Sequence, residues 1–250
     1  MKNRLLMLGV AIVLAYFNVL SCKIGPDFLV IGVTKCGTTS LYNWMVQHPK
    51  IHSRAKKEIH FFDGNYNKGF GWYNRHFSKK QPGQLSGEAT PGYFWKKACL
   101  PKVAKYCQGT KLILICRNPV KRVISEYFRL KRRGEEKLPF DQAIARAYNF
   151  GRYLGAGCYS EHLARWLSFF PRKDIHIMFL EELAVAPERE LNKVFGFLGL
   201  KNYRINSYEP RNKATYDASQ IRPETIRYLE KFYEPFNQKF AKMLGRKLPW

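Results

Sequence analysis

The chain has 250 residues, of which 46% are hydrophobic and 25% charged, and this ordinary globular composition excludes a disordered chain or a repeat array. Its length suits one domain with a full hydrophobic core. Lys and Arg total 43 against 19 Asp and Glu, so the formal net charge at pH 7 is +24. Such an excess indicates polyanionic partners, which include nucleic acid, an anionic membrane and an acidic polymer or cofactor.

The amino terminus carries the pattern of a targeting segment. Lys2 and Arg4 precede an uncharged run over residues 5–22. A basic flank followed by such a run is typical of a secretory signal peptide or a signal-anchor, and this run is close to the shortest that spans a bilayer. We expect residues 1–22 to form one or the other, with the basic flank cytosolic and the protein anchored to the membrane or exported.

The six cysteines show no close pair and no metal-ligand spacing, so the sequence predicts no metal site. Cys99 and Cys107 could form a disulfide if the compartment is oxidising.

Three short apolar runs rich in β-branched residues predict buried parallel strands, at 28–33, 112–116 and 175–180. Helical patterns follow at 39–47, 119–134, 161–170 and 187–198, and a last helix opens at Pro223, which Pro235 must kink or split. Alternating strands and helices predict a single α/β domain with a P-loop-like central parallel sheet flanked by helices.

The loop after the first predicted strand has the composition of an anion-binding site. Backbone N–H groups at a helix start and the helix dipole attract an anion, Gly37 permits close approach, and Lys35 adds a positive charge. The residues expected to contact the anion are Lys35, Cys36, Gly37, Thr38, Thr39 and Ser40. A tight turn with a solvated Lys is the alternative.

Two features distinguish this loop from a nucleotide-triphosphate loop. Its spacing, Gly32-x4-Gly37, is similar, but Thr38 stands where that motif has Lys. The second predicted strand ends in Arg117 rather than in the Asp that holds magnesium. The missing Lys and Asp would suit the transfer of a group that carries less charge than a phosphoryl group. A sulfuryl group is one such group, and we expect its transfer to require no metal.

A second anion site is predicted where Arg117 follows its strand and Pro119 opens a helix, with Ser125 two turns further on. The alternatives are a surface salt bridge for Arg117 and a solvated position for Ser125. Two such sites at two strand ends suit a ligand with anionic groups at both ends.

The segment Lys57-Glu-Ile-His-Phe-Phe-Asp63 contains an acid–base group. In an extended segment, Glu58 and His60 share one face, so Glu58 is a candidate general base and His60 can orient it or share the proton. A surface Glu58 paired with Lys56 or Lys57 is the alternative.

These motifs together resemble the sulfotransferases that use 3′-phosphoadenosine-5′-phosphosulfate (PAPS). Lys35-Cys-Gly-Thr-Thr resembles their 5′-phosphosulfate loop, and Arg117-Asn-Pro with Ser125 resembles their 3′-phosphate site. The likeness extends over residues 28–250 and is closest to the heparan sulfate 3-O- and N-sulfotransferases and their bacterial relatives. It implies a sulfotransferase domain over 28–250, in the Golgi lumen if the source is eukaryotic and exported or membrane-bound if it is bacterial.

The catalytic segment also matches that family. Its Lys-Glu-x-His-Phe-Phe pattern implies that Glu58 is the base, with His60 and Asp63 at matching positions and Lys35 beside the leaving group. Ala89 stands where the heparan sulfate enzymes have Lys, so fine specificity cannot be carried over. A carboxyl-terminal loop resembles the family's Lys-Gly-Arg donor loop and implies donor contacts from Arg211, Asn212, Lys213 and Thr215.

The resemblance implies sulfuryl transfer from PAPS to a hydroxyl or amine of an anionic carbohydrate such as a glycosaminoglycan, with no nucleic-acid partner. Exposed aromatics such as Trp72, Tyr73 and Trp95 would stack on sugar rings. The alternatives are a small-molecule kinase, a non-catalytic heparin- or nucleic-acid-binding module, and, among sulfotransferases, a chondroitin, small-alcohol or tyrosine acceptor.

Overall fold

The computed structural model describes residues 25–52, 57–78, 80–146, 151–210 and 221–250, and they contain a five-stranded parallel sheet of order β2-β3-β1-β4-β5. The strands are β1 Phe28–Gly32, β2 Ile51–His52, β3 Leu85–Ala89, β4 Lys111–Cys116 and β5 Ile175–Phe179. The predicted single α/β domain with a central parallel sheet is confirmed. The predicted targeting segment, residues 1–22, lies outside the described residues.

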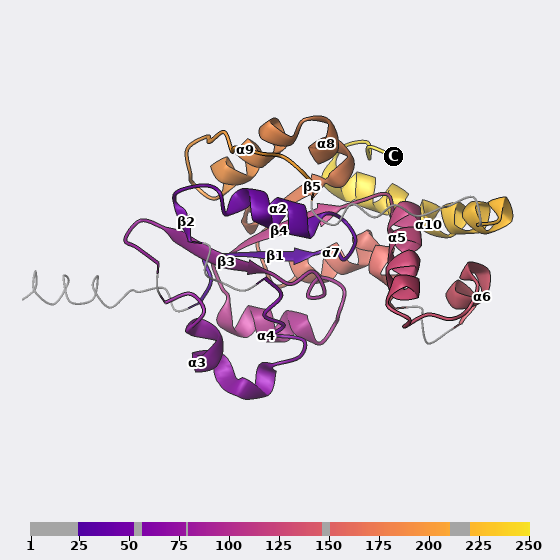
Figure 1. Ribbon diagram of the computed structural model, residues 1–250, viewed down its shortest axis with the longest axis horizontal. Helices are drawn as coiled ribbons and strands as arrows, with labels where there is room; N and C mark the ends of the chain where they lie inside the picture. Colours follow the sequence, from indigo (N-terminus) through magenta and orange to yellow (C-terminus); the bar gives the residue numbers. More distant parts are fainter. Residues whose placement is uncertain (1–24, 53–56, 79, 147–150, 211–220) are drawn as a thin grey trace, which may run out of the picture.

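Helices cover both faces of the sheet (Figure 1), with α2, α8 and α9 on one face and α4 and α7 on the other. The helices are α2 Thr38–Met45, α3 Gly69–Asn74, α4 Cys99–Tyr106, α5 Pro119–Arg132, α6 Phe140–Ala145, α7 Tyr159–Leu167, α8 Leu180–Val185, α9 Pro187–Phe197 and α10 Pro223–Leu244, with 3-10 turns η1 Tyr66–Lys68, η3 Gly155–Gly157 and η4 Arg172–Asp174. Within the parts of the chain described, no helix combines the length and apolarity that crossing a bilayer requires.

The strands that the sequence predicted are the apolar central ones. All five residues of β1 are buried, as are five of the six residues of β4, which is typical of strands covered on both faces. Strands β2 and β3 were not predicted, because β2 has only two residues and β3 reads Leu-Ser-Gly-Glu-Ala. The last helix, α10, continues through Pro235 as one element of 22 residues and is not split there.

None of the five described cysteines forms a disulfide. The suggested Cys99–Cys107 bridge is therefore wrong for this structure, where Cys99 instead directs its thiol at the carbonyl oxygen of Phe62, 3.7 Å away.

Gly87 of β3 lies directly beside Phe28 of β1, with no room for a side chain between them. A Cβ at residue 87 would lie 2.2 Å from the carbonyl oxygen of Phe28 and 2.7 Å from its ring. We predict that Gly87→Ala lowers the free energy of unfolding by about 1–3 kcal/mol or more, because the strands must separate to admit a methyl group. Chemical denaturation measures this change.

Gly71→Ala in α3 is the matched control, because a Cβ there meets nothing within 4 Å. Alanine at a helical position should leave stability unchanged or raise it by up to about 1 kcal/mol. Equal denaturation midpoints for Gly87→Ala and Gly71→Ala would contradict the proposed crowding.

Candidate active site

The loop between β1 and α2 leaves the helix start without a cap from the protein. Gly37 has a φ of 86°, a backbone conformation that favours glycine, and a Cβ there would also have to displace the end of the Leu180 side chain, 2.7 Å away. No described side chain makes a capping hydrogen bond at the start of α2. The first N–H groups of a helix need an acceptor, so this end suits an anionic ligand.

Arg117 lies directly beside this loop. Strands β1 and β4 pair in parallel, so the residues that follow them lie together at the carboxyl-terminal ends of the strands. Arg117 Nη1 donates to the carbonyl oxygen of Lys35 at 3.4 Å. The structure therefore brings together the two basic residues that the sequence assigned to two anion sites.

Tyr159 links the two strand ends from below. Its hydroxyl donates to the carbonyl oxygen of Arg117 at 2.8 Å and lies 3.7 Å from Cys36 Sγ. The sequence reasoning missed Tyr159, because an aromatic residue at the start of a helix has the pattern of an ordinary core position.

Cys36 itself faces the interior. Its N–H donates to Val33 at 3.1 Å and its side chain is fully buried, which raises the thiol pKa to about 12. The side chain of Cys36 therefore packs in the interior beneath the loop, and neither it nor the N–H group is free to contact the predicted anionic ligand in this geometry. Thr38 and Ser40 are also buried, whereas Gly37 and Thr39 are partly exposed.

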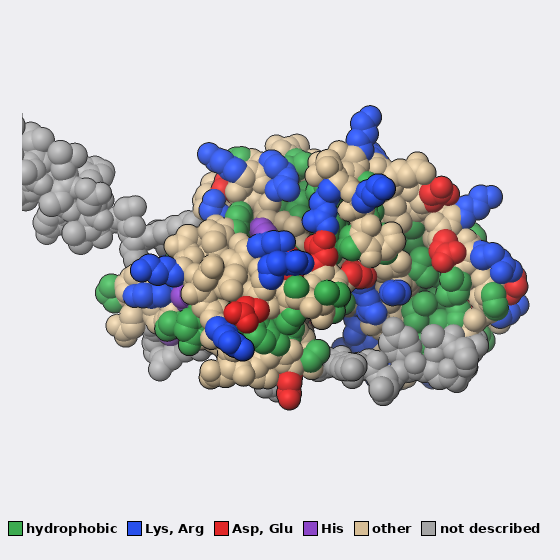
Figure 2. Space-filling model, turned by 90° about the horizontal axis from the view of Figure 1, so that it is seen from above, with side chains coloured by type: hydrophobic (Ala, Val, Ile, Leu, Met, Phe, Trp, Pro, Cys, Tyr) green, Lys and Arg blue, Asp and Glu red, His purple; other side chains and the backbone are tan. Residues whose placement is uncertain are grey.

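Several positive charges act on Lys35. Burial is the largest cause of its lowered pKa, and the charges of Arg129, Arg132 and Arg117 lower it further, against an opposing effect of Glu126. Lys and Arg side chains are also spread over the face seen from above, with Asp and Glu side chains among them (Figure 2). A polyanion is the ligand class that such a field attracts.

The second anion site differs from the first in how its helix begins. Asn118 caps α5, because its side-chain oxygen accepts from the N–H groups of Val120 and Lys121 at 2.9 and 3.2 Å. Those N–H groups are thus already paired. The predicted anion contact would therefore be made by the side chains of Arg117 and Ser125. Ser125 lies on the buried side of α5 with 6% exposure.

The catalytic segment brings its predicted side chains together, but not in an extended conformation. Glu58 and His60 have φ angles of 62° and 54°, so the expected extended backbone is wrong. Their side chains still meet: His60 Nε2 lies 3.5 Å from Glu58 Oε2, and His60 Nδ1 lies 3.0 Å from Asp63 Oδ1. Lys96 Nζ pairs with Asp63 Oδ2 at 2.7 Å. Glu58 also pairs with Lys57, as the alternative reading supposed.

These contacts shift the pKa values of the segment. The hydrogen bond from His60 is the main reason that the pKa of Glu58 falls to about 2. Hydrogen bonds to Asp63 and then to Glu58 raise the pKa of His60 to about 9. Burial would raise the pKa of Asp63, but hydrogen bonds from His60 and Lys96 outweigh it and lower that pKa. At neutral pH, Glu58 is ionised and His60 is protonated.

Glu88, at the end of β3, holds the backbone of this segment in place. Its buried carboxylate accepts from the hydroxyls of Tyr73 (2.7 Å), Tyr93 (2.9 Å) and Thr90 (2.6 Å) and from the N–H of Ile59 (3.1 Å). Burial raises the pKa of Glu88, while the hydrogen bonds oppose that rise. Sequence reasoning missed Glu88, although a Glu inside a strand is unusual enough to signal a buried network.

Arg129 on α5 acts electrostatically both on Glu58 and on Lys35 in the loop between β1 and α2. Its two hydrogen bonds to Glu126, at 2.9 and 2.8 Å, are the main cause of its raised pKa, and the charge of Glu58 adds to that rise. The charge of Arg129 also lowers the pKa of Lys35. Glu58 and Lys35 are therefore coupled electrostatically to the same guanidinium.

The remaining predictions have mixed outcomes. The loop with Arg211, Asn212, Lys213 and Thr215 lies outside the described residues. Tyr73 cannot stack on a sugar, because it is fully buried, whereas Trp72 and Trp95 are partly exposed. The described residues contain no group of three or more His, Cys, Asp or Glu side chains placed to hold a metal ion.

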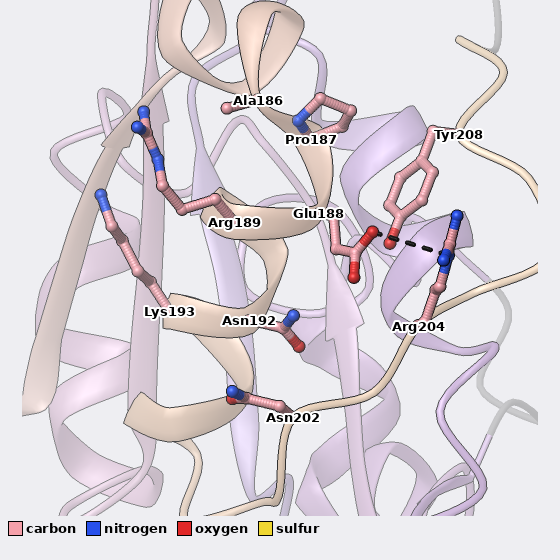
Figure 3. Close-up of a pocket in the computed structure, with 9 residues that line it drawn as sticks. All are labelled: Ala186, Pro187, Glu188, Arg189, Asn192, Lys193, Asn202, Arg204 and Tyr208. Atoms are coloured by element: carbon pink, nitrogen blue, oxygen red, sulfur yellow. Dashed lines mark ion pairs between the residues drawn. The ribbon is translucent and has the colours of Figure 1, made fainter.

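A surface pocket of about 870 Å³ lies between α9 and the segment 202–208 (Figure 3), and none of its lining residues is a predicted site residue. Glu188 pairs with Arg204 across it at 3.7 Å. Arg189 and Lys193 both pair with Glu190, so the pocket's cations have carboxylate partners. We assign it no part in the chemistry.

Comparison with known proteins identifies the family. The model of the sulfotransferase domain matches residues 25–237. The chain belongs to the sulfotransferase family. It is 32% identical to human heparan sulfate glucosamine 3-O-sulfotransferase 5 over 90% of this chain and 74% of that protein. It is 31% identical to human heparan sulfate glucosamine 3-O-sulfotransferase 3B1 over 94% of this chain and 67% of that protein.

Solved structures show the same fold in other sulfotransferases. A sulfotransferase from Alicyclobacillus acidocaldarius is 25% identical, with a TM-score of 0.77 over 89% of this chain and 97% of that one. A mouse sulfotransferase complexed with PAP is 15% identical, with a TM-score of 0.60 over 88% and 87%. This sulfotransferase is thus an enzyme of the sulfuryl-transferring class.

The Glu88 network generates a prediction about the site's geometry. Glu88→Gln replaces an oxygen that accepts hydrogen bonds with an NH₂ group that donates them, so at least one of the four buried donors loses its acceptor. We expect the free energy of unfolding to fall by about 1–3 kcal/mol and the transfer rate to fall with it. Tyr73→Phe, which removes one donor and leaves the carboxylate, should have a smaller effect on both. Equal effects of the two substitutions would contradict the network.

The raised pKa of His60 predicts a pH-dependent contribution to stability. That contribution is fully present below the unfolded pKa of about 6.5 and is lost as the pH rises through about 9. The difference in unfolding free energy between the wild type and His60→Gln should therefore shrink between pH 6.5 and 9.5. Burial lowers the pKa of His76, so His76→Gln should show a flat difference over this range. A flat difference for His60→Gln as well would contradict the pairing with Asp63 and Glu58.

Proposed function

We propose that this sulfotransferase moves a sulfuryl group from PAPS to a hydroxyl or amine of an anionic carbohydrate, with a glycosaminoglycan-like polysaccharide as the acceptor. The observation that carries the donor assignment is the contact of Arg117 with the carbonyl oxygen of Lys35 at two neighbouring strand ends. It puts two anion-binding groups within the length of one nucleotide that is charged at both ends.

The residues present fit such a donor. The uncapped start of α2 and the glycine at residue 37 leave room for a 5′-phosphosulfate against backbone N–H groups. Lys35 neutralises the charge that grows on the leaving oxygen. Arg117 and Ser125 hold the 3′-phosphate. PAPS supplies the sulfuryl group, and the chain supplies the binding, orientation and proton transfer.

Glu58 takes the acceptor proton. It is ionised at neutral pH, and an attacking hydroxyl must lose a proton as its oxygen bonds to sulfur and the bond from sulfur to the leaving oxygen breaks. His60, protonated and held by Asp63, orients the carboxylate. Lys96 fixes Asp63 from the other side, so the base is positioned through three successive contacts.

Two observations support a polyanionic sugar as the acceptor. The matched human relatives are named as heparan sulfate glucosamine 3-O-sulfotransferases. The net charge of +24 and the arginines around Lys35 favour an acceptor that is itself negatively charged. Ala89, which is buried, provides no cation at its position, so the acceptor contacts of this chain differ from those of a site with Lys there.

Transfer of labelled sulfate from PAPS to a panel of desulfated glycosaminoglycans tests the function. We expect sulfation of at least one glycan, and product mapping identifies the position. Salt-sensitive glycan binding without any transfer would favour a binding module. Magnesium-dependent consumption of ATP in place of PAPS would favour a kinase.

Glu58→Gln tests the assignment of the base. We expect the turnover number to fall about 100-fold or more while PAPS binding is retained, because the amide cannot accept the proton. Lys35→Ala should instead weaken PAPS binding as well as turnover. Glu234→Gln, on the exposed side of α10, is the matched control and should leave both unchanged. Near-normal turnover in Glu58→Gln would remove Glu58 from the mechanism.

A further inference from the structure

A face formed by η1, α3 and α4 combines aromatic rings with lysines that lie over them. We call it the aromatic–lysine face, and its members are Tyr66, Lys68, Trp72, Lys102, Lys105 and Tyr106. In Figure 1, α3 lies at the lower left and α4 below the sheet, at the end of the molecule away from α10.

Each lysine lies over a half-buried ring. Lys68 Nζ lies 4.6 Å from the ring centroid of Trp72, and Lys102 Nζ lies 4.5 Å from that of Tyr66. Lys105 Nζ lies 5.2 Å from the ring centroid of Tyr106. The rings are packed from beneath, where the Phe70 ring stacks on Tyr106 at 4.3 Å.

The charge on this face is uncompensated. None of its three lysines forms an ion pair with a described residue, whereas other lysines of the same region are paired with aspartates. The chain segments that build the face, 64–87 and 89–125, contain no Asp or Glu at all. An anionic surface would meet only positive charge here.

The chain enters the fold at this face. The N–H of Gly25 donates to Asn74 Oδ1 at 2.8 Å, and a Cβ at Gly25 would lie 3.3 Å from the Phe70 ring. The uncharged run of the sequence ends at residue 22, so two residues, 23 and 24, separate it from Gly25. The three steps from residue 22 to Gly25 span at most about 10 Å, so a membrane that holds that run would lie next to this face.

Lys35 and Arg117 lie at the other end of their strands. Gly25 precedes the amino end of β1, whereas Lys35 follows its carboxyl end. A five-residue strand is about 16 Å long. The chain also runs from Tyr106 into the amino end of β4, and Arg117 follows its carboxyl end. A surface that covers the aromatic–lysine face thus leaves open the strand ends that carry Lys35 and Arg117.

We propose that the aromatic–lysine face rests on an anionic membrane surface, which the amino-terminal run holds against it. Trp and Tyr rings favour the level of the lipid headgroups, where their apolar bodies and polar tips are both satisfied. Lysines beside them attract anionic headgroups and keep their ammonium groups in water. The proposal extends the predicted membrane anchor and is independent of the sulfuryl-transfer chemistry.

A sulfated glycan is the other ligand that lysines over aromatic rings would suit. The membrane is favoured because the chain that leads from the uncharged run to Gly25 can span at most about 10 Å, and because Lys35 and Arg117 lie at the opposite end of strands β1 and β4.

Tryptophan quenching by lipid tests the proposal on the full chain, reconstituted in vesicles of phosphatidylcholine and phosphatidylserine with brominated acyl chains. Residues 1–24 contain no Trp, so any quenching reports on the domain. We expect bromine to quench the wild type and Trp72→Phe to lose at least half of that quenching. Trp95→Phe, on the catalytic side, is the matched control and should retain it. Equal quenching in Trp72→Phe and the wild type overturns the proposal, as does failure of the full chain to float with vesicles.

Charge reversal tests the role of the lysines. In the double variant Lys68→Glu/Lys105→Glu, quenching should fall at least twofold in phosphatidylserine vesicles and change little in phosphatidylcholine alone. Lys231→Glu/Lys242→Glu on α10 is the matched control and should leave quenching unchanged. Both double variants should retain PAPS-dependent transfer in detergent, which shows that they fold. Unchanged quenching together with weaker binding to soluble heparin would assign the face to a glycan and overturn the proposal.

Discussion

The parallel pairing of β1 with β4 is the constraint on which the site depends. It places Lys35 and Arg117 at one edge of the sheet, close enough for the arginine to donate to the lysine's carbonyl oxygen. Tyr159 fastens both strand ends from the interior. The two helices that leave this edge then differ: α2 begins without a side-chain cap, whereas Asn118 caps α5. Unpaired backbone N–H groups are therefore available at the start of α2, whereas the first N–H groups of α5 are already paired with Asn118.

Three carboxylates near this edge have three different environments. Glu58 is partly exposed and hydrogen-bonded to His60, which lowers its pKa. Asp63 is buried but meets two cationic partners, and the partners prevail. Glu88 is buried among neutral donors, and burial prevails, so its pKa rises. The same functional group therefore acts as a candidate base, as an orienting partner and as a structural anchor, according to what surrounds it.

The sequence predicted the parts of the fold and site that depend on local pattern. Apolar runs predicted β1 and β4 and placed Lys35 and Arg117 at the ends of two strands, and the structure adds that the two residues are in contact. Strand β3 could not be predicted, because its serine, glycine and glutamate are explained only by tertiary partners. Because β3 was not predicted, the role of Glu88 within it was not predicted either. Its four hydrogen-bond donors come from three separate parts of the chain.

Backbone conformation at the catalytic segment was also beyond the sequence. The side chains of Glu58 and His60 do share one face, but through left-handed backbone that hydrogen bonds from outside the segment hold in place. In that region of φ, glycine, asparagine and aspartate are the residues with the least strain, and β-branched residues have the most. A library randomised at these two positions and selected only for folded protein should therefore enrich residues other than Glu and His. If Glu58 is the base, as proposed, selection for folding and selection for activity oppose each other at these two codons.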